Sequence, residues 1–195
     1  MSSSAVPALL SASSPPLSED RRAELDSLLS RYSPWPLDAP APNSAELDLV
    51  LDAALRAPDH GALRPWRYAV IAGDARSALG EVFVDAARLR GEAADAERFR
   101  AKAMAAPLII AMAAHVRTGH KVPELEQLMS GAAAAMNMLN ALHLLGYGGF
   151  WATGVHSRDP HIRRALGFGV QDHVLGFLYV GTARPGASAP ARPLV

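Results

Sequence analysis

Hydrophobic residues recur at helical spacing in two segments near the N-terminus. Three leucines behind an acidic start predict a first helix over residues 17–31, because this spacing places them on one face. Asn43 or Ser44 can cap a second helix, which ends before Pro58. The segment 33–42 between them contains four prolines and is predicted to be neither helix nor central strand, since each proline removes a backbone donor and fixes φ.

Four later segments have the pattern of β-strands. Residues 66–72 are rich in aromatic and β-branched side chains and end at a Gly-Asp pair. Residues 107–115 form an unbroken apolar run, which is typical of a strand buried on both faces. Shorter strands are predicted for residues 150–154 and, from an alternating pattern, for residues 174–181.

Helices are predicted between these strands. Two of them cover residues 75–90 and 93–104, and a short one covers residues 159–166. Residues 124–145 contain no proline and are rich in Ala, Met and Leu, so they predict a long helix that is apolar nearly all round and therefore buried. Helices and strands alternate without a strict βαβ rhythm, which favours an α+β fold with a mixed β-sheet flanked by helices.

The length of 195 residues, half of them hydrophobic, indicates one domain with a substantial core. We expect this domain to cover residues 17–184. Residues 1–16 are rich in Ser, Ala and Pro and lack a basic start, so they are interpreted as a disordered leader rather than a secretory signal. Residues 185–195 are expected to form an extended C-terminal tail.

Composition excludes several classes of function. The 19 basic residues balance the 19 acidic ones, so there is no excess positive charge for nucleic acid. The chain has no cysteine, which excludes disulfides and thiolate chemistry and is consistent with a cytoplasmic protein. No apolar run reaches the roughly 20 residues that span a bilayer, so no membrane partner is expected.

Metal and hydrolase sites are not indicated either. The pairs His115 with His120 and His156 with His161 are five residues apart, and a helix face joins residues three or four apart. Ser130 lies in Met-Ser-Gly inside a predicted helix rather than in a nucleophile elbow, and is interpreted as a small packing residue. No Gly-x-Gly-x-x-Gly motif follows a strand, so a Rossmann domain is not predicted. No metal ligand is assigned.

A set of individually weak motifs remains, and their order along the chain is specific. They are Ser-Arg-Tyr-Ser at 30–33, Arg-Ala-Pro-Asp-His at 56–60, Arg-Pro-Trp-Arg at 64–67, His-Lys-Val-Pro at 120–123 and Gly-Gly-Phe-Trp-Ala-Thr-Gly at 148–154. Here the chain resembles the nitroreductase family, in particular its compact YdjA-like members. The resemblance extends from about residue 24 to residue 184.

The resemblance implies an α+β nitroreductase-like fold, homodimeric through a long central helix, with FMN bound at the dimer interface. The FMN contacts that it implies are Arg31, Tyr32, Ser33, Arg56, His60, Trp151, Ala152 and Thr153, of which Arg56 and His60 reach the flavin of the partner chain. A segment assigned to NAD(P) in the relatives corresponds to Ala141, Leu142, His143, Leu144, Leu145 and Gly146.

The charge expected around FMN can be judged from residue chemistry. A guanidinium at a helix end, such as Arg31, offers a bidentate partner for a phosphate, although it can also serve only to neutralise its own helix. Reduced flavin is stabilised by positive charge near its pyrimidine edge, which Arg56 or Arg64 can supply. Tyr32 and Ala152 depart from the family pattern, which often has arginine at both positions. The group that offsets the phosphate charge therefore stays open, and the candidates are Arg184 after the last strand and an arginine of the partner chain.

The expected function is that of an FMN-dependent oxidoreductase. In it, NAD(P)H passes electrons through FMN to a nitroaromatic, a quinone or a similar small acceptor by a ping-pong mechanism. The cofactor carries this chemistry, so no acid or base is required and no catalytic residue is assigned. The alternatives are a non-catalytic flavin-binding dimer and a nitroreductase-fold enzyme with other flavin chemistry.

Overall fold

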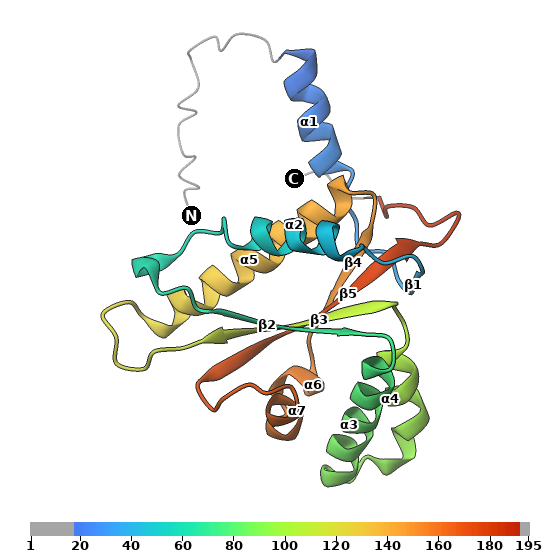
Figure 1. The fold of residues 1–195 in the computed structure, drawn as a ribbon, viewed down its shortest axis with the longest axis vertical. Coiled ribbons are helices and arrows are strands. Elements are labelled where there is room, and N and C mark those ends of the chain that lie inside the picture. The colour runs from blue at the N-terminus through green and yellow to red at the C-terminus, as the bar shows by residue number, and fades with distance from the viewer. Residues whose placement is uncertain (1–17, 192–195) are drawn as a thin grey trace, which may run out of the picture.

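The computed structural model describes residues 18–191 (Figure 1). The predicted leader, residues 1–16, lies outside the described residues, as do the last four residues of the predicted tail. In chain order the elements are α1 (Glu19–Leu29), β1 (Leu37–Asp38), α2 (Ser44–Ala54), η1 (His60–Ala62), β2 (Trp66–Ala72), α3 (Ala75–Leu89), η2 (Ala93–Asp95), α4 (Ala96–Ala103), β3 (Leu108–His115), α5 (Glu124–Leu144), β4 (Gly148–Ala152), α6 (Val155–Arg158), α7 (Pro160–Ala165) and β5 (Asp172–Ala183).

The strands form one sheet in the order β1-β5-β3-β2, and β4 also pairs with β5. The α+β class with helices flanking a sheet is confirmed. Every ladder among the described residues is antiparallel, however, whereas a mixed sheet would also contain parallel pairs. The connections explain this difference. The helical hairpin α3–α4 starts and ends at the same end of the sheet, so β2 and β3 run antiparallel. Strands β3 and β4 do not pair with each other, because β5 lies between them.

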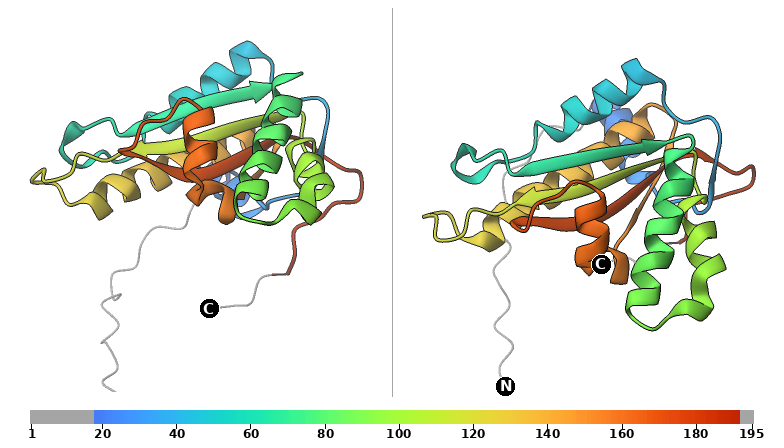
Figure 2. Two further views of the ribbon diagram at one scale, coloured as in Figure 1. Left: turned by 90° about the horizontal axis from the view of Figure 1, so that it is seen from below. Right: turned by 60° about the horizontal axis from the view of Figure 1, so that its bottom comes forward.

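Helices cover both faces of this sheet (Figure 2). The central strand β3 is buried along nearly its whole length, as its apolar run predicts. Its alternate side chains enter two separate cores. Ile109, Ala111 and Ala113 pack in the core that includes residues of α3 and α4, and Leu108, Ile110 and Met112 pack in the core that includes residues of α2 and α5. We call these sides the α3/α4 face and the α2/α5 face.

Helix α5 is long, as predicted, but only part of its apolar surface is buried within one chain. Met138 and Leu142 are fully buried in the core of the α2/α5 face. Leu125, Met129 and Met136 are exposed by 67%, 54% and 38%, respectively. The expectation of burial all round is therefore wrong for the single chain, because an all-apolar helix packed on one sheet can bury only one side.

Helix α1 is also poorly buried. It projects from the body of the molecule (Figure 1), and none of its residues is buried. Leu25, Leu28 and Leu29, which define its predicted apolar face, are exposed by 46%, 42% and 67%. Both α1 and α5 thus present apolar side chains that residues 18–191 do not cover.

The proline-rich segment contains the short strand β1, which the sequence pattern did not predict. It pairs with the end of β5, Leu37 opposite Ala183 and Asp38 opposite Thr182, at the edge of the sheet where proline is tolerated. A Cβ atom on Gly181 would lie 2.7 Å from the carbonyl oxygen of Asp38, so the close approach of β1 requires glycine there. No helix among residues 18–191 has the length and apolar character needed to cross a bilayer.

Candidate functional site

An aromatic cavity of about 480 Å³ lies on the α3/α4 face, between α4, α6 and the loop that follows α1. This volume is within the range of small-molecule sites. The side chains around it are mostly apolar, with two cations and one histidine: Trp35, Arg98, Phe99, Lys102, Val155 and His156. We call it the ring cavity.

Trp35 is held at the ring cavity by contacts with two strands. Its ring centroid lies 4.7 Å from that of Phe150 in β4 and 4.9 Å from that of Tyr179 in β5, the latter edge-on at 88°. The chain is fixed just beyond it, where the backbone N–H of Leu37 donates to the carbonyl of Ala105 at 3.0 Å. Trp35 stays 43% exposed, so a flat ligand can reach its face.

Two of the predicted FMN segments adjoin, in sequence, residues that line this cavity. Ser33 is two residues before Trp35, and Thr153 is two residues before Val155. Arg31 donates from Nη1 to Ser33 Oγ at 3.4 Å, so these two predicted phosphate contacts lie side by side. Residues 31–33 and 151–153 are about 120 positions apart in the chain, yet the residues that follow each segment, Trp35 and Val155, line one cavity.

Other predicted contacts have structural partners. The hydroxyl of Tyr32 donates to the carbonyl of Ala187 at 3.1 Å and holds the C-terminal tail against the end of α1. Trp151 donates from Nε1 to the carbonyl of Leu175 at 3.0 Å and packs with the core of the α2/α5 face, as Trp66 does. The tryptophan that lines the ring cavity is Trp35.

Charge near the ring cavity comes mainly from α4. Arg98 forms an ion pair with Asp95 at 2.9 Å. Lys102 forms no hydrogen bond or ion pair with the described residues, and burial, assisted by the neighbouring Arg98, lowers the pKa of its ammonium group. Arg184, which sequence reasoning considered for the phosphate, is paired with Asp38 at 3.1 Å. Lys102 is therefore the cation best placed to compensate an anionic ligand in the cavity.

His156 is a polar side chain enclosed by aromatic rings. It is 2% exposed, stacks on Phe83 at 4.1 Å between centroids and 13° between planes, and meets Phe99 edge-on at 5.0 Å. Neither of its nitrogens has a hydrogen-bond partner among residues 18–191. A buried imidazole without a partner costs stability, and it marks this wall of the cavity as the place where a polar ligand atom would be favoured.

Burial also keeps His156 neutral. Desolvation, with the positive charges of Lys102 and Arg90, lowers the pKa of His156 to about 4 against the opposing influence of Asp159 and Glu92. An unfolded chain binds this proton near pH 6.5, about 2.5 pH units higher. The unfolded state therefore takes up a proton first as pH falls, and stability is lost between about pH 6.5 and pH 4.

We expect His156→Phe to remove that loss. Between pH 7 and pH 4.5 the wild type should lose roughly 2–3 kcal/mol more of its free energy of unfolding than the variant. At pH 7 the variant should be at least as stable, because phenylalanine packs between the rings without an unpartnered nitrogen. Urea unfolding of flavin-free protein at both pH values measures the difference, and equal losses in the two proteins would refute it.

Arg56 lines a different cavity, and His60 directly follows Asp59, which also lines it. This cavity, of about 420 Å³, is formed at the end of α2 and includes Arg56, Arg64 and Trp66. His60 Nδ1 is 3.1 Å from Ser130 Oγ in the first half of α5, whereas residue 30 contacts His143 near the last turn. Positions 130 and 143 are about 20 Å apart along a helix. One chain therefore does not bring Arg56 and His60 to the ring cavity.

The segment predicted for NAD(P) is the C-terminal end of α5 and the turn after it. His143 Nε2 is 3.0 Å from Ser30 Oγ, which places the segment beside residues 31–33. Leu142 is fully buried, Leu144 is 63% exposed, and Gly146 has φ of 85° where the helix ends. The exposed members of the segment are the ones that a ligand can contact.

None of the residues that line the ring cavity was singled out as a site residue from sequence. Trp35 lies between two prolines directly after residues 31–33, and this position was the available signal. Phe99 and Lys102 lie in an ordinary amphipathic helix. His156 was considered only as a metal ligand with His161. These residues come from three distant segments, so no local pattern joins them.

Comparisons of the sequence and of the fold with known proteins point to the same family. The model of the nitroreductase family matches residues 28–182. The protein named "Putative NAD(P)H nitroreductase YdjA" from Escherichia coli strain K12 is 39% identical over 165 residues, which cover 84% of this chain and 90% of that protein. The residues matched by the family model, 28–182, agree with the range of about 24–184 over which the motifs resemble the family.

Solved structures show the same fold. A nitroreductase-like family protein from Bacillus cereus has a TM-score of 0.78 at 18% identity, covering 94% of this chain and 95% of that one. A mutant of an FMN- and NADPH-dependent nitroreductase from Sphigopyxis sp. strain HMH has a TM-score of 0.70 at 17% identity, covering 88% and 94%. By sequence and by fold, the chain belongs to the nitroreductase family.

Proposed function

We propose that this chain is an FMN-dependent oxidoreductase that passes electrons from NAD(P)H to a small acceptor such as a quinone or a nitroaromatic. The observation that carries the proposal is the ring cavity, which is lined by Trp35, Phe99 and Val155, and two of these follow the predicted FMN segments 31–33 and 151–153 in sequence. The names of relatives support it: one is an NAD(P)H nitroreductase by name, and another is FMN- and NADPH-dependent.

The residues present fit a flavin ring and a phosphate. Trp35 and Phe99 offer aromatic surface to a flat ring, and Lys102 supplies positive charge to its polar edge. Arg31 and Ser33 offer a guanidinium and a hydroxyl to the phosphate. FMN supplies the redox chemistry when bound, taking up a hydride and releasing electrons to an acceptor. The protein binds and orients the ring and shields it from water.

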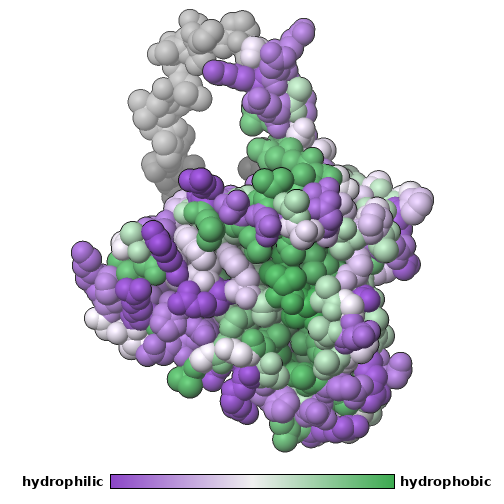
Figure 3. All heavy atoms as spheres, viewed as in Figure 1, coloured by the Kyte–Doolittle hydropathy of each residue, from purple (hydrophilic) through white to green (hydrophobic). Residues whose placement is uncertain are grey.

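The proposed site is completed by a second copy of the chain. Arg56 and His60 are exposed at the opposite end of α5 from Arg31, so they contact an FMN molecule only if it belongs to a partner. The apolar side chains on α1 and α5 provide a surface for that partner. Figure 3 shows a band of apolar side chains that begins at the base of α1 and runs down the middle of the view. Exposed apolar areas of this kind are typical of protein interfaces.

Turnover of NAD(P)H tests the proposed function. Protein loaded with FMN should oxidise NADH or NADPH when a quinone or a nitroaromatic is added, and protein stripped of FMN should not. Because one cavity serves both half-reactions, initial rates at several acceptor concentrations should give parallel double-reciprocal lines. Loaded protein that oxidises neither donor would instead indicate a flavin-binding protein without this activity.

A further inference from the structure

A second cavity adjoins the ring cavity and shares Val155 with it. It has a volume of about 390 Å³ and lies between the end of α3 and the α6–α7 corner. Leu89, Val155 and Pro160 give it an apolar floor, while Arg158, His161 and Arg164 supply its polar rim. We call it the arginine cavity.

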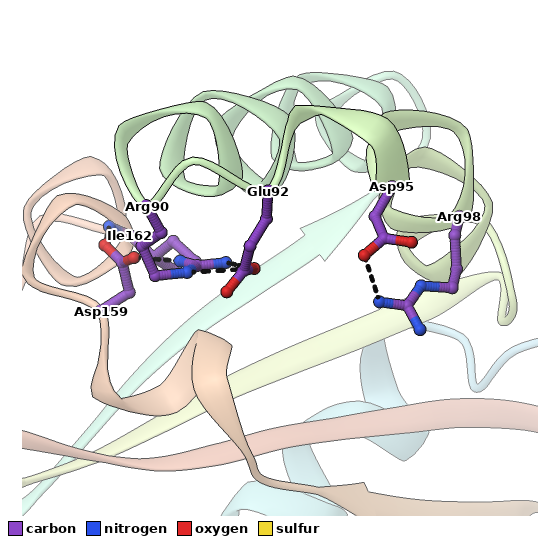
Figure 4. Close-up of polar contacts among 6 residues, drawn as sticks. All are labelled: Arg90, Glu92, Asp95, Arg98, Asp159 and Ile162. Carbon is purple, nitrogen blue, oxygen red and sulfur yellow. Dashed lines mark hydrogen bonds and ion pairs between the residues drawn. The ribbon is translucent and has the colours of Figure 1, made fainter.

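The corner that carries these arginines is fixed by a buried carboxylate. Asp159 is 8% exposed and accepts hydrogen bonds from the backbone N–H groups of His161 at 2.8 Å and Ile162 at 3.3 Å, which caps α7. It also forms an ion pair with Arg90, which in turn pairs with Glu92 at 3.0 Å (Figure 4). The end of α3 is thereby joined to the start of α7, so the rim of the arginine cavity is preorganised.

The rim carries positive charge that the described part of the chain does not compensate. Arg90 is matched by two carboxylates, Asp159 and Glu92. Arg158 and Arg164 are exposed, and their side chains form no hydrogen bond or ion pair with residues 18–191. Two guanidinium groups without carboxylate partners, beside an apolar floor, suit a ligand that joins phosphates to a flat ring.

We propose that the arginine cavity binds a phosphate group of the NAD(P)H donor while its nicotinamide lies over the ring cavity. This inference rests on the proposed function. Val155 lines both cavities, so a dinucleotide that extends from one enters the other. The phosphate is either the pyrophosphate, which NADH and NADPH share, or the 2′-phosphate of NADPH alone. NAD(P)H then binds on the α3/α4 face, away from residues 141–146 at the end of α5 and in the turn after it.

Charge reversal in the FMN-loaded enzyme tests this site. Arg158→Glu and Arg164→Glu should each raise the KM for the donor about tenfold, the equivalent of one charge-assisted hydrogen bond, and leave kcat unchanged. The increase should become smaller as salt is raised. Arg88→Glu is the matched control, because Arg88 on α3 is exposed, pairs with Asp85 of its own helix at 3.0 Å, and lies outside both cavities and outside α1 and α5.

Comparison of NADH with NADPH shows which phosphate the arginines bind. A KM increase for NADPH alone assigns the arginines to the 2′-phosphate, and an equal increase for NADH and NADPH assigns them to the pyrophosphate. KM values within twofold of the wild type for both donors and both variants would overturn the site. Calorimetric titration with NADP⁺ and NAD⁺ makes the same comparison without turnover: weaker binding by the variants supports the site even if no oxidation occurs, and unchanged binding overturns it.

Discussion

Replacing Gly176 with alanine is expected to destabilise the protein by roughly 3–5 kcal/mol, the sum of a disallowed backbone conformation and a steric overlap. Gly176 in β5 has φ of 136°, and a Cβ atom there would lie 2.4 Å from the carbonyl oxygen of Ala152 and 2.6 Å from Nε1 of Trp151. Relief of the overlap must move the end of β4. Residues 151–153, which precede the lining residue Val155, would then be displaced, and FMN affinity should fall as well.

Urea unfolding and titration with FMN, followed by flavin fluorescence, measure both effects. Gly169→Ala is the matched control, since the atom nearest to its added Cβ is the Asp172 carboxylate at 3.5 Å and its φ is not positive. We expect that control to change the free energy of unfolding by less than about 1 kcal/mol. A Gly176→Ala protein as stable as the control would contradict the proposed role of this glycine.

The double variant Met129→Glu with Met136→Glu is expected to be monomeric and to lose most of its FMN affinity. Both methionines lie on the exposed apolar side of α5, where two added charges would be buried against a partner. Loss of the partner removes its Arg56 and His60 from the flavin. At about tenfold for each lost contact, FMN affinity should fall roughly 100-fold.

Val170→Glu provides the control for this experiment. Val170 is 76% exposed, in the loop before β5, and is not part of α1 or α5. Its variant should keep the mass of a dimer by light scattering and bind FMN as the wild type does. A double variant that is monomeric but binds FMN normally would show that one chain holds the whole site.

The helices and most strands could be predicted because their signals are local. The apolar run of β3 and the proline-free stretch of α5 each report burial or helix formation within one segment. Strand β1 could not be predicted, because it exists through pairing with β5 and through the absence of a side chain on Gly181. The extent of burial of α5 was also not encoded locally, since apolar residues have the same periodicity whether sheet or partner covers them.

The candidate site was predictable only in part. The motifs around Arg31 and Thr153 pointed to the two stretches of chain that are followed by the lining residues Trp35 and Val155, but none of the predicted residues lines the cavity itself. The cavity is formed by tertiary packing of Trp35, Phe99 and His156. Hydrophobic periodicity and local motifs do not predict contacts between positions so far apart in the chain. The contribution of Arg56 and His60 requires a second chain, so it remains a prediction.

The most direct test of the central claim is the visible absorbance spectrum of the purified protein, loaded with FMN and repeated anaerobically after adding NADH or NADPH. A flavin spectrum that bleaches on addition of a donor, and returns when a quinone is added, is the predicted result. A protein that takes up no FMN on reconstitution, or whose bound flavin keeps its spectrum with both donors, would contradict the proposed oxidoreductase.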